Sequence, residues 1–179
     1  MARFVVLLRG VNVGTGKRVP MAAFRAMLEE MGHTGVATLL NSGNGVFTTR
    51  ARSGARLAAA IASAVEATFG VVTPVIVKSA AELDTIIATA PMRPPEDQHS
   101  RVLVAFGPDR AAVAALEPLV ALARAPERLM LTPHAGYLHC PAGILQSAVG
   151  EAMLGKAGKG VTTRNWATVL KIQAALRAG

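Results

Sequence analysis

The glycine-rich segment LLRGVNVGTGKRVPM, residues 7–21, contains the residue types that could bind an anion. Its basic side chains Arg9, Lys17 and Arg18 stand among glycines, and Pro20 marks the start of an amphipathic helix. A loop of this kind can hold a phosphate group through backbone N–H groups and the dipole of the helix that follows. The alternative is that the glycines only allow the chain to turn between a strand and a helix.

The segment matches no standard nucleotide-binding motif. A phosphate-binding GxxxxGK loop needs a following Ser or Thr for Mg²⁺, but Gly10 and Gly16 are one residue too far apart and Arg18 replaces the hydroxyl. A dinucleotide-binding GxGxxG pattern also fails, because Val19 stands at the third glycine position. Any phosphate binding here would therefore lie outside these two classes.

A second polar group, Asn41, Ser42 and Asn44, lies in the segment LLNSGNGVF. If the first two strands run parallel, as in a split βαβ unit, the loops that follow them emerge at the same edge of the sheet. We then expect loop residues 9–18, including Asn12, to lie near Asn44. The alternative is that the amide and hydroxyl side chains only stabilise a hairpin.

The segment Thr162-Thr163-Arg164-Asn165-Trp166 covers the end of a predicted strand and the start of a predicted helix. We expect Thr163 to cap the helix and Trp166 to pack in the core. Arg164 and Asn165 would then project toward a ligand, and they join the candidate binding residues.

The sequence offers little support for metal or cofactor chemistry. His134, His139 and Cys140 are too few for a closed zinc site, and adjacent strand residues point to opposite faces. A buried structural role is expected for Cys140. We therefore predict no metal and no cofactor, and the sequence leaves open whether the protein is an enzyme.

Hydrophobic patterning predicts an α+β protein made of two ferredoxin-like subdomains, each followed by an extra helix. The first half has strands at residues 3–8, 36–40, 45–49 and 73–78. Helices are predicted after Pro20 and after Ser53, and a third helix begins at a Ser79–Glu82 capping box. Residues 101–179 repeat this order with strands at 101–106, 128–132, 136–140 and 160–163. The predicted domains are residues 1–90 and 101–179, joined by a Pro-rich linker at 91–100.

The chain carries 19 basic and 11 acidic residues, a net charge of +8. Such a charge attracts nucleic acid or phosphorylated ligands, although 14 of the 19 are arginine, which a GC-rich genome also favours. No apolar run approaches the roughly 20 residues of a membrane span, and the single cysteine excludes an internal disulfide. We therefore expect a cytoplasmic protein without a membrane partner.

Three segments, LLRGVNVGTGKRVPM, LLNSGNGVF and GVTTRNWATVLK, together resemble the bacterial domain of unknown function 1697 family. The resemblance implies two ferredoxin-like subdomains and no established activity. It also implies a basic, GIGRSKL-like stretch where this chain has GILQSAV, so that Gln146 and Ala148 replace residues that are often basic.

The leading hypothesis for function is binding of a phosphorylated ligand or a nucleic acid backbone through the loop at residues 9–18. Two alternatives remain open. One is a metal-independent enzyme that polarises a small anionic metabolite with Arg9, Lys17 and Asn44. The other is a scaffold or oligomerisation protein; the sequence does not predict an oligomeric state.

Overall fold

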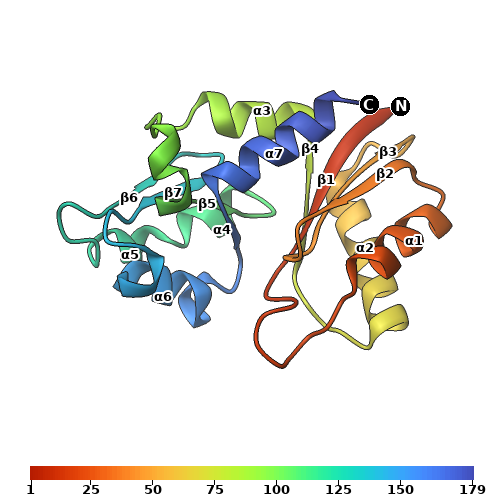
Figure 1. Ribbon diagram of the computed structural model, residues 1–179, viewed down its shortest axis with the longest axis horizontal. Helices are drawn as coiled ribbons and strands as arrows, with labels where there is room; N and C mark the ends of the chain where they lie inside the picture. Colours follow the sequence, from red (N-terminus) through yellow and green to blue (C-terminus); the bar gives the residue numbers. More distant parts are fainter. The chain divides into compact units, whose positions relative to one another are not determined.

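A computed structural model describes residues 1–179 as a mixed α+β chain with two four-stranded antiparallel sheets (Figure 1). The chain divides into two compact units. Unit 1 comprises Met1–Leu83 and Lys171–Gly179, and unit 2 comprises Asp84–Leu170. Each unit is built on one of the two sheets.

Unit 1 has the strand order β2-β3-β1-β4, which is that of a ferredoxin-like fold. Strand β1 is antiparallel to β3, and β3 is antiparallel to β2, so β1 and β2 run parallel with β3 between them. The elements in chain order are β1 (Ala2–Leu8), α1 (Met21–Glu30), β2 (Thr34–Leu39), β3 (Asn44–Thr49), α2 (Gly54–Phe69), β4 (Val75–Ser79) and α3 (Ala80–Ala88).

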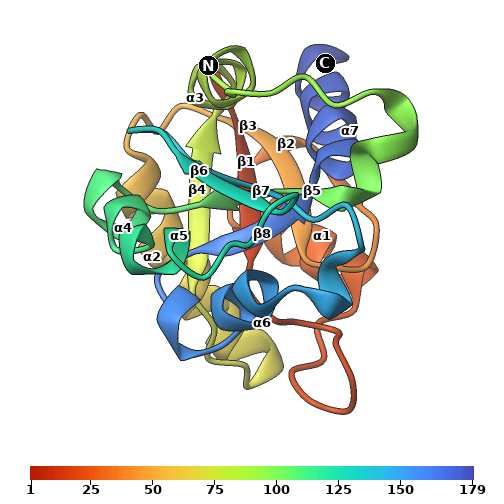
Figure 2. The same cartoon turned by 90° about the vertical axis from the view of Figure 1, so that its left-hand side faces the viewer.

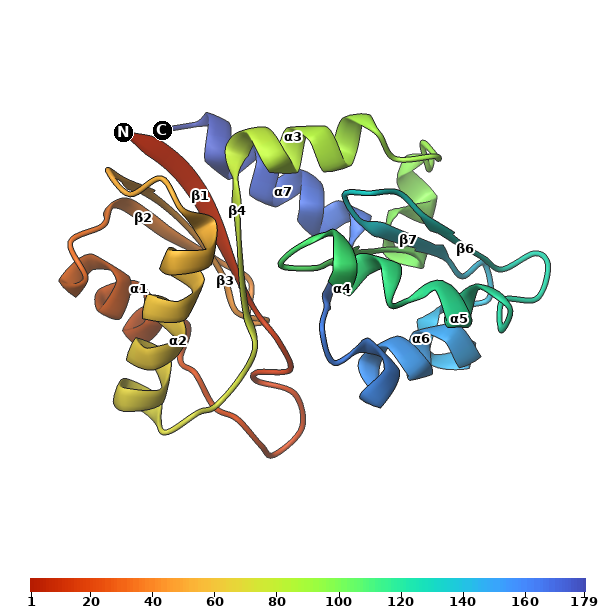
Figure 3. The ribbon, with the colours of Figure 1, turned by 180° about the vertical axis from the view of Figure 1, so that it is seen from behind.

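Helices α1 and α2 cover one face of this sheet (Figure 3). Leu57, Ile61 and Val65 of α2 recur every four residues, so they share one face of the helix and pack on alternate residues of β1 such as Phe4 and Val6. This burial of apolar side chains is the main favourable contribution to the stability of unit 1.

Two predicted helix starts, at Ser53 and Ser79, are confirmed in atomic detail. The Ser53 hydroxyl accepts a hydrogen bond from the Arg56 N–H at 3.3 Å. Ser79 and Glu82 form a reciprocal capping box, in which the Ser79 N–H donates to the Glu82 carboxylate (2.8 Å) and the Glu82 N–H donates to the Ser79 hydroxyl (3.2 Å).

Unit 2 repeats the topology with the strand order β6-β7-β5-β8 (Figure 2). The fold class predicted from the sequence is therefore confirmed. The elements are η1 (Glu96–Arg101), β5 (Val102–Phe106), α4 (Arg110–Ala114), α5 (Glu117–Val120), β6 (Arg128–Leu131), β7 (Gly136–His139), η2 (Ile144–Gln146), α6 (Ala148–Leu154), η3 (Lys156–Gly158), β8 (Thr162–Asn165) and α7 (Trp166–Arg177).

The bounds of the two units differ from the predicted ones. The division falls inside α3, at Leu83/Asp84, and the last nine residues belong to unit 1, where Arg3 donates a hydrogen bond to the Ala175 carbonyl at 3.0 Å. The Pro-rich segment 91–100 is tied to the end of α3, because the Arg93 guanidinium donates to the carbonyls of Ile87 (2.7 Å) and Ala88 (3.0 Å). Composition alone could not reveal these contacts.

No helix in the structure combines the length and the apolar character that a membrane span requires.

His33 is a buried polar residue that should make unit 1 sensitive to acid. Its ring stacks on Phe47 at a centroid distance of 4.4 Å, and neither ring nitrogen has a hydrogen-bond partner. Burial lowers the pKa of His33 below the ordinary 6.5, so the unfolded chain takes up a proton at a pH where the folded protein resists it. Stability should therefore fall as the pH drops below about 6.5.

The substitution His33→Phe is expected to raise the free energy of unfolding by about 1 kcal/mol at pH 7, because it removes two unsatisfied polar atoms and keeps the stacking on Phe47. The gain should grow between pH 7 and pH 5. Urea unfolding of both proteins across this range measures it. Parallel stability profiles for the variant and the wild type would contradict the assigned role of His33.

Candidate functional site

Three loops of unit 1 leave the sheet at the same edge. Leu8 at the end of β1 pairs with Val75 at the start of β4, while Asn44 at the start of β3 pairs with both Leu7 and Leu39. The loops at residues 9–20, 40–43 and 70–74 therefore begin or end side by side, and we call them together the loop edge (Figure 1).

Hydrogen bonds join the three loops to one another. The Leu8 N–H donates to the Gly43 carbonyl at 2.9 Å, and the Arg9 N–H donates to the Pro74 carbonyl at 3.1 Å. The Thr73 hydroxyl donates to the Arg9 carbonyl. The loop edge is thus one connected structure.

Asn12 closes the base of the long loop. Its side-chain amide donates to the carbonyls of Val19 and Asn41, both at 2.8 Å, and its Oδ1 accepts from the Val19 N–H at 2.9 Å. Asn12 also adopts a left-handed backbone with φ 58°, which asparagine tolerates better than most residues. The contact with Asn41 confirms that the loops after β1 and β2 meet.

The basic residues of the long loop differ in their surroundings. Lys17 and Arg18 are exposed, and the Arg18 guanidinium donates to the Gly14 carbonyl at 3.0 Å. Arg9 is half-buried at the base of the loop, where burial lowers the pKa of its guanidinium. Lys17 and Arg18 are therefore the most accessible positive charges of this loop.

Asn44 lies behind the loop edge and not on its surface. The residue is fully buried, and its amide donates to the Leu39 carbonyl (3.0 Å) and the Ser42 hydroxyl (3.1 Å). These contacts close the turn between β2 and β3, so Asn44 positions the hairpin.

Arg164 and Asn165 belong to unit 2, at the end of β8. The Arg164 side chain is buried, and its guanidinium donates to the Thr162 hydroxyl (2.9 Å) and the Thr163 carbonyl (2.8 Å). Burial lowers the pKa of Arg164 to about 10. Asn165 caps α7 by accepting from the Thr168 N–H at 2.9 Å.

The cap of α7 corrects the prediction for this segment. Thr163 was expected to cap the helix, but it lies within β8, and the strand extends to Asn165. Asn165 follows Thr163 by two residues and is the stronger capping residue, so the prediction failed because it ended the strand two residues too early. Trp166 is buried at the start of α7, as predicted.

The positive charge of the protein is concentrated in unit 1. This unit contains 11 basic and 4 acidic residues, a net charge of +7. Unit 2 contains 8 basic and 7 acidic residues, a net charge of +1. The loop edge itself includes Arg9, Lys17 and Arg18 and no acidic residue.

The start of α1 adds to the positive potential near Lys17 and Arg18. Pro20 precedes the helix and provides no side-chain cap, and the first turn contains no acidic residue. No carboxylate in the first turn of α1 therefore offsets the positive end of its helix dipole.

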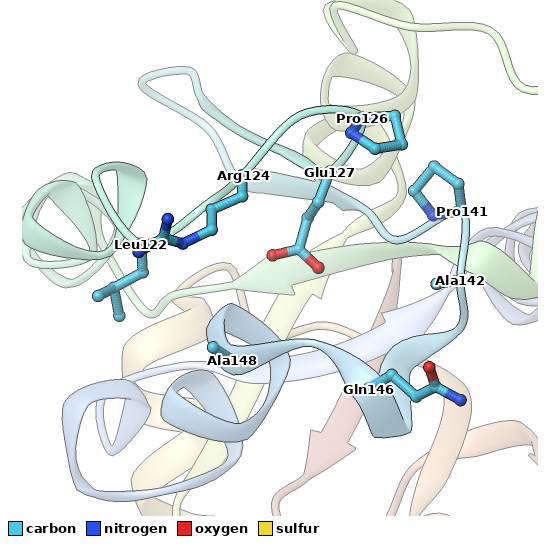
Figure 4. Close-up of a pocket in the computed structure, with 8 residues that line it drawn as sticks. All are labelled: Leu122, Arg124, Pro126, Glu127, Pro141, Ala142, Gln146 and Ala148. Atoms are coloured by element: carbon cyan, nitrogen blue, oxygen red, sulfur yellow. The ribbon is translucent and has the colours of Figure 1, made fainter.

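Unit 2 contains a surface pocket of about 250 Å³ that the sequence did not predict (Figure 4). It lies between the segment before β6 and the segment after β7, and the Glu127 carboxylate points toward its centre. Gln146 and Ala148 both line it, together with Leu122, Arg124, Pro126, Pro141 and Ala142. The two lining segments lie apart in the sequence and share no motif.

Cys140 lies next to this pocket but is not a reactive thiol. The residue is buried, and burial raises the pKa of the thiol. A hydrogen bond with Ser147 lowers the pKa, while the nearby Glu127 carboxylate raises it further. A neutral, buried thiol is a poor nucleophile, which agrees with a structural role for Cys140.

Comparison with known proteins identifies a family and a fold. A family model described as "Protein of unknown function (DUF1697)" matches residues 1–137. No curated protein matches the chain. The structure is similar to that of the conserved bacterial protein SP0830 from Streptococcus pneumoniae, with 23% sequence identity, a TM-score of 0.73, and coverage of 98% of this chain and 99% of that one.

Proposed function

The chain belongs to the DUF1697 family, a family of proteins of unknown function, and we propose from its geometry that unit 1 binds the phosphate backbone of nucleic acid through the loop edge. The observation that carries the proposal is the charge of the two units, +7 against +1. Arginine itself is spread over both units, with eight in unit 1 and six in unit 2, so the difference in net charge comes as much from the acidic residues, four against seven, as from the basic ones. Such a charge attracts polyanions and is typical of nucleic-acid-binding surfaces.

The residues of the loop edge have different roles in this proposal. Lys17 and Arg18 are exposed and contact phosphate groups. Arg9 contributes positive charge from the base of the loop, where its backbone is held by Thr73 and Pro74. Asn12 holds the loop closed and does not itself contact the ligand.

A polymer of phosphates fits this surface better than a single phosphate group. The excess charge of unit 1 extends beyond the loop edge, since Arg50, Arg52 and Arg56 are also exposed. A small phosphorylated ligand would interact only with the basic side chains of the loop edge. A nucleic acid gains from the whole field of the unit through the release of bound counterions.

The test is a fluorescence-anisotropy titration with a labelled oligonucleotide at two or more salt concentrations. The double variant Lys17→Ala/Arg18→Ala should bind the oligonucleotide about tenfold more weakly than the wild type. It loses two charge-assisted contacts to phosphate, and each loss weakens binding by about threefold. The slope of log K against log salt should also become shallower by about 0.7 to 0.9 for each lost contact.

The matched control is Arg50→Ala/Arg52→Ala. This variant removes the same charge from the same unit, but the residues follow Thr49, which pairs with Ala2 at the opposite edge of the sheet. It should lose less affinity than Lys17→Ala/Arg18→Ala. Equal losses would indicate only a general charge effect, and no salt-sensitive binding by the wild type would contradict the proposed function.

A further inference from the structure

Each loop of the loop edge exposes one aliphatic side chain to solvent. Val13 is 70% exposed in the loop after β1, Leu40 is 53% exposed in the β2–β3 turn, and Val72 is 68% exposed in the loop before β4. Single exposed apolar residues are ordinary, but here one stands on each of three loops that are hydrogen-bonded to one another. Val13 shares its loop with Arg9, Lys17 and Arg18, and hydrogen bonds join that loop to the loops of Leu40 and Val72.

Leu40 is held on an unfavourable backbone. Its φ of 56° lies in the left-handed region, where a leucine is strained and an asparagine or glycine is not. The Leu40 side chain is more than half exposed, so its packing within unit 1 offsets only part of the backbone strain. Strain kept at an exposed apolar residue points to a role in binding.

A partner of this surface must combine negative charge with accessible apolar area. A nucleic acid duplex offers phosphates, but its base faces are stacked on one another and hidden. A single strand offers the same phosphates with bases that can be unstacked, and apolar side chains pack on the faces of such bases.

We infer that the loop edge prefers single-stranded to double-stranded nucleic acid, with Leu40, Val13 and Val72 packed on bases while Lys17 and Arg18 contact phosphates. This inference rests on the proposed function. The three loops contain no aromatic residue, so binding should be weaker than on an aromatic stacking surface and largely independent of sequence.

The test compares single- and double-stranded oligonucleotides of equal length in anisotropy titrations with wild type and Leu40→Asn. The wild type should bind the single strand more tightly. Leu40→Asn should weaken single-strand binding about fivefold, the low end of what the loss of one base contact costs, and leave the salt slope unchanged. Its melting temperature should be no lower than that of the wild type, because asparagine relieves the strain at φ 56°.

The matched control is Leu145→Asn. Leu145 is fully exposed in unit 2, so the same chemical change outside the loop edge should not alter binding. A third arm titrates phosphatidylglycerol vesicles, which also combine anionic groups with apolar area.

The outcomes separate the inference from the proposed function. Equal affinity for single strand and duplex, or unchanged binding by Leu40→Asn, would overturn the inference and leave salt-sensitive phosphate binding intact. The absence of salt-sensitive binding to either oligonucleotide would overturn both. Vesicle binding that Leu40→Asn abolishes, without oligonucleotide binding, would assign the surface to lipid and overturn both as well.

Discussion

Replacing Gly158 with alanine should lower the free energy of unfolding of unit 2 by about 3 kcal/mol or more. Gly158 is buried where the chain passes the C-terminal end of α6. A Cβ atom at this position would overlap the carbonyl oxygen of Met153, which is backbone and has no rotamer through which to move away. The substitution must therefore displace the chain between α6 and β8.

Trp166 makes this prediction easy to measure. It is the single tryptophan of the chain and is buried in unit 2, so its fluorescence follows the unfolding of that unit in urea. The control is Gly160→Ala, because a Cβ there would meet Ala112 at 3.7 Å, an ordinary contact. If the two variants unfold at the same urea concentration, the steric argument for Gly158 is wrong.

Replacing Gly43 with alanine is expected to cost unit 1 about 3 kcal/mol, because two penalties of about 1–2 kcal/mol each combine. The backbone has φ 79°, which disfavours any side chain. An added Cβ would also lie 2.7 Å from the Leu8 Cβ and 2.8 Å from a Val11 methyl group. Since the Gly43 carbonyl accepts from the Leu8 N–H, the substitution should also disturb the loop edge.

The control Gly14→Ala separates the two penalties at Gly43. Gly14 has φ 60° but nothing within 4 Å of an added Cβ, so it should lose only the conformational part, about 1 kcal/mol. Hydrogen exchange at the β1 and β3 amides measures the stability of unit 1 in both variants. Equal effects would show that the close approach of Gly43 to β1 has no energetic consequence.

Strand direction was the part of the site that the sequence could predict. The order β-α-β-β fixes β1 and β2 as parallel, so the loops that follow them had to meet, and the Asn12–Asn41 hydrogen bond shows that they do. The capping residues Ser53 and Ser79 were also predictable, because their hydrogen-bond partners lie within three residues.

Burial of the polar residues could not be predicted in the same way. Asn44 and Arg164 are polar residues next to turns, where exposure is the usual expectation, yet both are buried. Each lies in a strand that pairs with a strand distant in the sequence, Asn44 with Leu7 and Arg164 with Val104. The pocket near Glu127 and Gln146 was missed for a similar reason, since it forms where two separate segments meet.

The unequal charges of the two units also bear on how an encounter begins. Because unit 1 holds seven of the eight net positive charges, the centre of charge is displaced toward unit 1 from the centre of mass. In the proposed function, the field of a polyanion attracts unit 1 more strongly than unit 2, so unit 1 should meet the polyanion first. Orientation of this kind reduces the number of unproductive collisions, and it weakens as salt shortens the range of the field to about 10 Å at 0.1 M.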